Sequence, residues 1–397
     1  MSKMTIEDLD LKGKSVVMRV DFNVPLKNGT ITDDNRIVQA LPSIRYVLDN
    51  GAKIILLSHL GRPKGEPNPE FSLKPVAEYL TKNLSQKVHF AEECIGDVAK
   101  KAIEAAGFGE VVLLENVRFH AGETKNDEKL SKEFASLGDV FINDAFGSSH
   151  RAHCSVAGIT EFLQPAAAGY LLEKEIKFLS ESINDPKRPF VAVLGGAKVS
   201  DKIGVIRNLI PKVDTIIIGG GMAYTFMKAK GLPIGSSLLE ADKVDLAGEL
   251  IEEAAAHNVK LLLPVDSMVS KEFSNDAPFK SVSEDGIEDG WMALDIGAKT
   301  TELFSNEVRN AKTIIWNGPM GVFEMENFSK GTFALARAMA DATTDGAITI
   351  IGGGDSASAI KKAGLDDKVS HVSTGGGASL EYLEGKELPG ITSLTDK

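Results

Sequence analysis

The chain has 397 residues, of which 43% are hydrophobic and 25% charged, and its formal net charge is −12 at pH 7. This composition is ordinary for a globular protein, and the length exceeds what one hydrophobic core normally supports, so we expect two domains. The acidic balance argues against nucleic acid as a partner but allows a local basic pocket for an anionic metabolite.

The first half of the chain alternates apolar strand-like runs with helical patterns such as residues 76–84 and 129–137. These βαβ units predict a parallel sheet, and ligands of such sheets bind at the carboxyl ends of the strands. The predicted strands are residues 15–22, 53–60, 110–119 and 139–146. The polar side chains at their ends are Asp21, His59, Arg62, Arg118, Asp144 and Arg151.

Cationic and imidazole side chains recur near these strand ends: Arg36, His59, Arg62, Arg118, His150 and Arg151. Guanidinium and imidazole groups are donors suited to carboxylate or phosphate. Any one of them alone is typical of a solvated surface. Their recurrence at strand ends of an acidic chain favours an anion pocket.

Helical spacing of apolar residues predicts a connecting helix over Ala166–Ile183, closed by Asn184-Asp185-Pro186. A second series of βα units follows. Its predicted strands are residues 190–194, 215–219, 259–264, 312–318, 347–353 and 369–374.

Four segments of the second half run from an apolar strand into glycines: residues 191–202, 215–224, 348–358 and 371–379. Glycines let backbone N–H groups approach a phosphate, and a helix that begins next adds its positive end. Neither the Walker-A pattern nor the dinucleotide-binding fingerprint is present. We therefore predict a nucleotide site of another kind.

Charged residues within these segments support the nucleotide prediction. Lys198 and Lys202, four residues apart, are expected on one face of a helix start, where a cation is unfavourable unless an anion binds. Asp355 is either a helix N-cap or a ligand of Mg²⁺, and the two roles are compatible. Glu324 lies in a predicted loop, where its carboxylate either accepts ribose hydroxyls or is simply exposed.

Other functions fit less well. Residues 354–358 lack the last glycine of a serine hydrolase elbow, and a nicotinamide dehydrogenase is disfavoured by the missing fingerprint. Cys94 and Cys154 are too few for a disulfide framework or zinc cluster, and we expect Cys154 to be buried and inert. His150 and His153 lack a third metal ligand, so hydrogen-bonding or anion-facing roles are favoured. No apolar signal segment or run of about 18 apolar residues occurs, so we expect a cytoplasmic protein without membrane contact.

Eight motifs, in order along almost the whole chain, resemble the phosphoglycerate kinase family: residues 19–25, 58–63, 115–119, 143–153, 194–203, 316–324, 352–356 and 373–379. The resemblance implies two Rossmann-like three-layer α/β domains with parallel sheets, joined by a helix and hinge. Residues 1–170 would form the phosphoglycerate-binding domain and residues 186–378 the nucleotide-binding domain, with residues 171–185 as the helix that connects them. Residues 379–397 would return to the first domain. The implied reaction is reversible phosphoryl transfer between 1,3-bisphosphoglycerate and ADP, giving 3-phosphoglycerate and ATP in glycolysis and gluconeogenesis.

The resemblance also implies roles for individual residues of a monomeric enzyme that uses Mg²⁺ as Mg-ATP or Mg-ADP. The implied substrate ligands are Asp21, Asn23, Arg36, His59, Arg62, Arg118 and Arg151. The implied nucleotide ligands are Gly195, Lys198, Lys202, Gly219, Gly220, Asn317, Pro319, Val322, Glu324, Gly353, Gly354, Asp355 and Ser356. Asp355 would hold the metal, and Ser356 stands where many members carry threonine.

Phosphoryl transfer needs alignment and charge stabilisation but no protein nucleophile. The transferred group spreads negative charge over three oxygens, which helix-start amides and cationic side chains can stabilise. The residues implied as catalytic are Arg36, Lys198, Lys202, Gly353 and Gly376. Because they belong to both halves, we expect the two domains to close around the substrates and exclude water.

Overall fold

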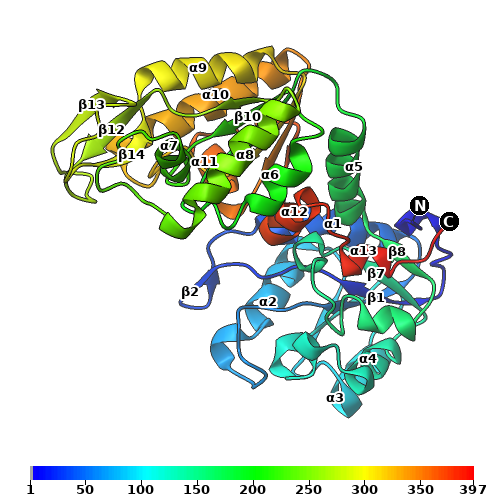
Figure 1. Cartoon of the computed structure of the whole chain (residues 1–397). Helices are drawn as coiled ribbons and strands as arrows, with labels where there is room; N and C mark the ends of the chain where they lie inside the picture. The colour runs from blue at the N-terminus through cyan, green and yellow to red at the C-terminus, as the bar shows by residue number, and fades with distance from the viewer. Residues whose placement is uncertain (1–2) are drawn as a thin grey trace. The chain divides into compact units, whose positions relative to one another are not determined.

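The computed structural model describes residues 3–397 and divides the chain into two compact units (Figure 1). The first unit comprises residues up to 177 together with 387–397, and the second comprises residues 178–386. Helix α5 (Tyr170–Asn184) contains the boundary between them. Among the described residues, no helix is long and apolar enough to cross a membrane.

The first unit is built on a parallel sheet of six strands in the order β5-β6-β4-β1-β7-β8. Its strands are β1 (Ser15–Arg19), β4 (Lys53–Leu57), β5 (Val88–Ala91), β6 (Val111–Leu114), β7 (Val140–Asn143) and β8 (Ala166–Ala168). Its α-helices are α1 (Asn35–Asp49), α2 (Lys74–Asn83), α3 (Gly96–Ala105), α4 (Glu128–Ala135) and the C-terminal α13 (Pro389–Thr392). A short hairpin joins β2 (Leu26–Lys27) to β3 (Thr30–Ile31).

Both faces of this sheet are buried. Val16 and Met18 of β1 belong to a core cluster that includes Ile44 of α1 and Leu80 of α2. The alternate β1 residue Val17, which points to the opposite face, is also 0% exposed. Burial on both faces is the reason that the strands read as continuous apolar runs in the sequence.

The second unit repeats the architecture with the strand order β11-β10-β9-β15-β16-β17. Its parallel strands are β9 (Phe190–Leu194), β10 (Thr215–Ile218), β11 (Lys260–Leu262), β15 (Thr313–Asn317), β16 (Ile348–Gly352) and β17 (His371–Val372). Its helices are α6 (Ile203–Leu209), α7 (Ala223–Ala229), α8 (Val244–Ala256), α9 (Ala298–Asn310), α10 (Lys330–Thr344), α11 (Gly354–Lys362) and α12 (Gly376–Leu383). The prediction of two three-layer α/β domains with parallel sheets is confirmed.

A smaller antiparallel sheet in the second unit was missing from the sequence prediction. It has the order β13-β12-β14, with β12 (Asp266–Ser270), β13 (Phe279–Ser283) and β14 (Met292–Ile296). Strand β12 carries an aspartate and two serines, so it lacks the apolar run by which the parallel strands were recognised.

The predicted helix over Ala166–Ile183 is wrong at its start. Ala166–Ala168 form strand β8, which pairs in parallel with Phe141–Asn143, and the helix begins at Tyr170. Alanine favours helix intrinsically, but burial beside β7 overrides that preference. The Oδ1 atom of Asp144 then accepts hydrogen bonds from the N–H groups of Leu171 and Leu172, at 2.9 and 3.2 Å, in the first turn of α5.

Candidate active site

Three predicted substrate ligands of the first unit form one cluster at the ends of neighbouring strands. Asp21 follows β1, His59 follows β4, and Arg36 belongs to α1. Arg36 Nη1 donates to Oδ2 of Asp21, and Nδ1 of His59 lies 3.9 Å from Oδ1 of the same carboxylate. The fully buried Arg19 places its Nη2 atom 3.0 Å from Nδ1 of His59.

The electrostatics of this cluster fix its charges. Burial opposes ionisation of Asp21, but the charges of Arg36, His59 and Arg19 outweigh it and lower the pKa of Asp21 to about 2. Burial, with the neighbouring arginines, holds the pKa of His59 well below its usual value against the opposing effect of Asp21. At neutral pH the group therefore contains an aspartate anion that orients Arg36 and a neutral imidazole.

The other three predicted arginines line one cavity of about 390 Å³. Its lining residues are Arg62, Lys64, Gly65, Arg118, His120, Ala121, Thr124, Lys125 and Arg151. Arg62 and Arg151 are exposed, whereas Arg118 is partly buried. A cavity bordered by three guanidinium groups and two lysines is suited to a small multiply charged anion.

Arg118, which lines this cavity, has one unused hydrogen-bond donor. Its Nη1 atom donates to the carbonyl oxygen of Gly61 at 2.9 Å, while Nε has no partner among residues 3–397. Burial, followed by the charge of Arg19, lowers the pKa of Arg118 to about 10, so the group stays cationic at neutral pH.

Asn23 connects the cluster around Asp21 to the loop before Arg62, because its Oδ1 atom accepts a hydrogen bond from Gly61 N at 2.9 Å. Asp21, Asn23, Arg36 and His59 are not among the residues that line the arginine cavity. The structure therefore places the predicted substrate ligands in two groups joined through Gly61. Lys64, His120 and Lys125 were missed by sequence reasoning; Lys64 and His120 each lie two residues after a predicted arginine, whereas Lys125 has no such signal.

The second unit has a cavity of about 550 Å³ built from the glycine-rich segments. Its lining residues are Gly195, Gly196, Ala197, Lys198, Asp201, Lys202, Asn317, Gly318, Gly353, Gly354, Asp355, Ser356, Gly376, Gly377 and Leu380. Nine of the predicted residues therefore lie together: Gly195, Lys198, Lys202, Asn317, Gly353, Gly354, Asp355, Ser356 and Gly376.

Two helices begin at this cavity. Helix α11 starts at Gly354 and helix α12 at Gly376, and a Cβ atom on Gly376 would lie 3.2 Å from Gly354 N. Gly353 has φ 89°, a conformation that side-chain-bearing residues rarely adopt, so the turn into α11 requires glycine. The converging N-termini direct unpaired N–H groups and partial positive charge at one place.

Lys202 is the buried cation of this cavity. It is 9% exposed, and its Nζ atom donates to Oδ1 of Asn317 at the end of β15. Burial lowers the pKa of Lys202 to about 8, although Asp201 and Asp355 oppose the shift. Lys198, by contrast, is exposed at the rim.

Two local predictions in this unit need correction. Lys198 and Lys202 do not lie on the first turn of a helix, because α6 begins at Ile203 and Lys202 is its N-cap residue. Asp355 is not an N-cap either: Gly353 occupies that position and Asp355 lies within the first turn of α11. Ser356 Oγ accepts a hydrogen bond of 2.6 Å from Gly318 N, which joins α11 to the loop after β15.

Five predicted nucleotide residues lie outside the lining of this cavity: Gly219, Gly220, Pro319, Val322 and Glu324. Gly220 N donates to Met320 O at 3.1 Å, and Gly196 N donates to Pro319 O at 3.1 Å, so these loops pack tightly together. A Cβ atom on Gly195 would overlap Pro319 O, which explains the glycine there. Glu324 is exposed in the loop before η8 (Glu326–Phe328).

The structure also bears on the alternative roles considered for the cysteine and histidine residues, as reactive thiols and as metal ligands. Cys94 and Cys154 are both free and buried, and burial raises the pKa of the Cys154 thiol to about 11. The Nε atom of Arg151 donates to Nε2 of His150 at 3.0 Å. In the described part of the chain, the one three-residue group with metal-ligand geometry is Glu93, Cys94 and His120, so the His150 and His153 pair is not part of such a group.

A basic cavity in one α/β unit and a glycine- and lysine-lined cavity in a second are typical of a kinase that acts on an organic anion. The family model described as phosphoglycerate kinase matches residues 6–386. Proteins named phosphoglycerate kinase from Clostridium tetani and Thermosipho africanus are each 58% identical, cover 100% of this chain, and are themselves covered over 98% and 99% of their lengths. The chain belongs to the phosphoglycerate kinase family.

Solved structures agree with this assignment. The phosphoglycerate kinase from Coxiella burnetii superposes with a TM-score of 0.90 at 45% identity, and that from Pyrococcus horikoshii with 0.85 at 33%. Each match covers 98% of both chains. The chain is thus an enzyme of glycolysis that transfers a phosphoryl group reversibly between 1,3-bisphosphoglycerate and ADP, giving 3-phosphoglycerate and ATP.

Proposed function

We propose that the two units divide the substrates of this reaction: the first binds phosphoglycerate and the second binds the magnesium nucleotide. The observation that carries the proposal is the contrast between the two cavities. One is lined by Arg62, Arg118 and Arg151, and the other by glycines at two helix N-termini with Lys198 and Lys202. The arginines suit a small anion with a carboxylate and a phosphate, while the backbone amides suit a polyphosphate.

In the first unit, Arg118 has a free Nε atom and Arg62 and Arg151 are solvent-accessible, so all three can bind the non-reacting phosphate of the substrate. Arg36, oriented by Asp21, is the donor for the carboxyl end where the phosphoryl group is added or removed. His59 and Asn23 complete this group, as a neutral imidazole and as the residue that holds the Gly61 loop.

In the second unit, the amides at Gly353, Gly354 and Gly376 lie where a nucleotide's phosphates would bind. The residues fit Mg²⁺: Asp355 is exposed at the cavity, and Mg²⁺ bound with phosphates takes one or two protein carboxylates. Asp355 is therefore the protein ligand, and the ion supplies charge neutralisation for the phosphates. We assign adenine contacts to Gly219, Gly220, Pro319 and Val322, and ribose hydroxyls to Glu324.

The transfer itself uses no covalent enzyme intermediate. The substrate carboxylate attacks in line, and Lys202, Arg36 and the helix-start amides stabilise charge on the moving phosphoryl group. Because Arg36 and Lys202 belong to different units, we propose that hinge bending brings the substrates together in a monomeric, cytoplasmic enzyme and excludes water.

Calorimetric titration of Arg118→Ala tests the division of substrates. We expect binding of 3-phosphoglycerate to weaken by about 10-fold or more while Mg-ADP binds as before, because a charged hydrogen bond to one ligand only is lost. Weaker Mg-ADP binding with unchanged 3-phosphoglycerate binding would contradict the assignment. Solution scattering tests closure: the radius of gyration should fall with 3-phosphoglycerate plus a non-hydrolysable Mg-ATP analogue and change little with either alone.

A further inference from the structure

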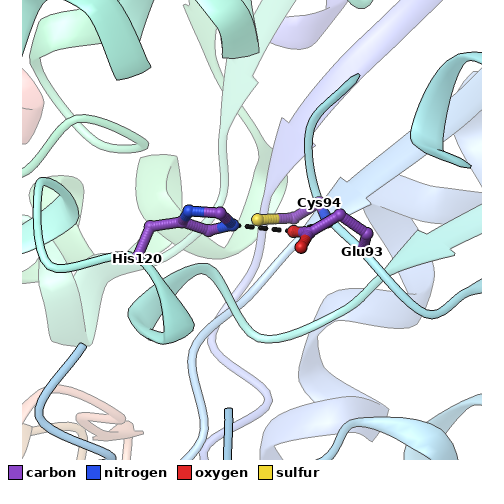
Figure 2. A group of neighbouring side chains, drawn as sticks. All are labelled: Glu93, Cys94 and His120. Carbon is purple, nitrogen blue, oxygen red and sulfur yellow. Dashed lines mark hydrogen bonds and ion pairs between the residues drawn. The ribbon is translucent and has the colours of Figure 1, made fainter. Parts of the chain in front are cut away.

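Glu93, Cys94 and His120 of the first unit gather three different metal-ligating side chains at one place (Figure 2). One carboxylate oxygen, one sulfur and one imidazole nitrogen all lie within 4.8 Å of one another. His120 Nε2 lies 2.7 Å from Oε1 of Glu93, and the backbone N–H of Cys94 donates to the same oxygen at 2.7 Å. Glu93 and Cys94 have no role in the phosphoryl transfer described above, whereas His120 also lines the arginine cavity.

The fold holds the three side chains in place. Glu93 and Cys94 lie between strand β5 and helix α3, and His120 directly follows η3 (Val117–Phe119) after strand β6. Strands β5 and β6 are parallel neighbours with the register Ala91 to Leu114 at their carboxyl ends. His120 N also donates to the carbonyl oxygen of Val117 at 3.3 Å, which fixes the start of its loop. The ligands thus come from two loops whose bases are tied by one sheet.

We propose that Glu93, Cys94 and His120 bind a borderline or soft divalent transition-metal cation, of which Zn²⁺ is the natural example. Thiolate, imidazole and carboxylate are the ligands that zinc takes in proteins, and three protein ligands leave a fourth position for water. The hard ion Mg²⁺ prefers oxygen ligands alone, so the nucleotide's metal would not compete well here.

The charge balance of the group favours a cation. A thiolate and a carboxylate together neutralise a divalent ion, and the carboxylates of Glu93, Glu123 and Glu115 all act on the Cys94 sulfur. The same negative field stabilises a cation once it replaces the thiol proton.

Binding requires only small movements. A tetrahedral zinc ion with bonds of about 2.0 to 2.3 Å needs ligand atoms about 3.3 to 3.8 Å apart. The distance between His120 Nε2 and Glu93 Oε1, now 2.7 Å, must increase slightly. The Cys94 sulfur, now within 4.8 Å of both atoms, must move closer to them if it lies beyond the required separation. Cys94 releases its proton to solvent as the metal–sulfur bond forms. The imidazole binds through Nε2, so the proton by which Nε2 donates to Glu93 is released to solvent and the ring carries one proton on Nδ1; no oxidant or other reactant is needed.

The test uses the full-length chain freed of metal and titrated with ZnCl₂ by calorimetry, and with CdCl₂ by ultraviolet absorption. Cd²⁺ reports a thiolate ligand directly, through a thiolate-to-metal charge-transfer band. We expect one tight equivalent of metal and a clear band in the unsubstituted protein. Cys94→Ser should lose the band, and His120→Gln should bind at least about 10-fold more weakly. Bound Zn²⁺ should also raise the midpoint of thermal unfolding, since it binds only the folded chain.

The chain supplies two matched controls. Cys154→Ser removes the other buried cysteine, whose thiol donates to the carbonyl oxygens of Gly122 and Asp127 at 3.2 and 3.3 Å. His89→Gln removes a histidine whose Nε2 atom makes an equivalent 2.7 Å pair with Glu110. In the described residues this pair is not part of a group of three metal-ligating side chains. Both variants should bind Zn²⁺ and Cd²⁺ as the unsubstituted protein does.

Cys94 is 0% exposed, so Cys94→Ser could fail to fold, and circular dichroism of each variant checks this. Glu93 and His120 have partly exposed side chains, at 39% and 27%, and Glu93→Gln removes the carboxylate with little change of shape. Absence of a cadmium–thiolate band in the unsubstituted protein would overturn the proposal. Equal Zn²⁺ affinity in folded Glu93→Gln, His120→Gln and unsubstituted protein would also overturn it.

Discussion

Lys202 donates a hydrogen bond from Nζ to Oδ1 of Asn317, and the two residues are only 9% and 3% exposed. The Nδ2 atom of Asn317 is buried without a hydrogen-bond partner in the described structure. A buried ammonium group with no ion-paired carboxylate is costly unless an anion binds beside it. We therefore propose that this pair stabilises the negative charge of a transferring phosphoryl group.

Lys202→Ala should lower kcat by about 10²-fold or more and change nucleotide affinity less, because charge stabilisation is needed most during the transfer. Steady-state assays with ATP and 3-phosphoglycerate measure both effects. Lys243→Ala, which removes a lysine paired with Asp242 on the surface, is the control and should keep normal kcat. A Lys202→Ala enzyme with a tenth of normal kcat would refute this role.

Arg62→Ala should raise the KM for 3-phosphoglycerate and leave kcat comparatively intact. We assign Arg62 to the non-reacting phosphate, so the lost interaction is common to ground state and transition state. Arg45→Ala changes an exposed arginine of α1 that is not among the cavity's lining residues, and should have no effect on KM. A raised KM for ATP with an unchanged KM for 3-phosphoglycerate would mean that Arg62 belongs to the other substrate.

Asp355→Asn should raise the Mg²⁺ concentration for half-maximal rate several-fold, because the amide is a poorer ligand than the carboxylate. Nucleotide should still bind through the backbone amides. Asp201→Asn is the matched variant, since Asp201 lines the same cavity. If the Mg²⁺ titration shifts for Asp201→Asn and not for Asp355→Asn, then the metal ligand has been misassigned.

The contribution of Asp144 and Asp295 to stability should fall as pH rises from about 4 to about 7, whereas the lowered pKa values of His59 and His153 act in the opposite direction. Burial raises the pKa of Asp144 from its ordinary value of 3.8 to about 7. Burial also raises the pKa of Asp295 to about 7. In this window the folded state holds protons on Asp144 and Asp295 that the unfolded chain has released, so these two groups lower the free energy of unfolding as pH rises. Urea unfolding across this range should show a free energy of unfolding that changes with a more positive slope against pH for Asp144→Asn than for the unsubstituted protein. Asp49→Asn, at the exposed end of α1, should reproduce the unsubstituted slope; an Asp144→Asn slope equal to it would contradict the pKa assignment.

The sequence predicted the central strands of both parallel sheets, such as β6 and β9, well because they are buried on both faces and apolar throughout. Strand β5 was missed because Val88, His89 and Phe90 are each only half buried and one of them is polar. The alanines of β8 were assigned to the following helix because neither intrinsic propensity nor helical spacing registers pairing with a distant strand.

Site residues were predictable where both the residue type and its place at the end of a strand or the start of a helix can be recognised in the sequence. Glycines that precede helices and arginines at strand ends were found because both features are local. The grouping of Glu93 and Cys94 with His120 could not be predicted from the sequence, because it depends on the pairing of β5 with β6. The helix start at Ile203 was placed too early because the segment 199–202 forms a turn rather than a first helical turn.

Hydrogen–deuterium exchange of the full chain, followed by mass spectrometry, tests the division of substrates most directly. With 3-phosphoglycerate alone, protection should appear in residues 19–62 and 118–151 and be absent from the glycine-rich segments. With Mg-ADP alone, protection should appear in residues 195–202 and 352–377, at the helix starts that line the second cavity. Protection of residues 118–151 by Mg-ADP, with none in residues 352–377, would contradict the account.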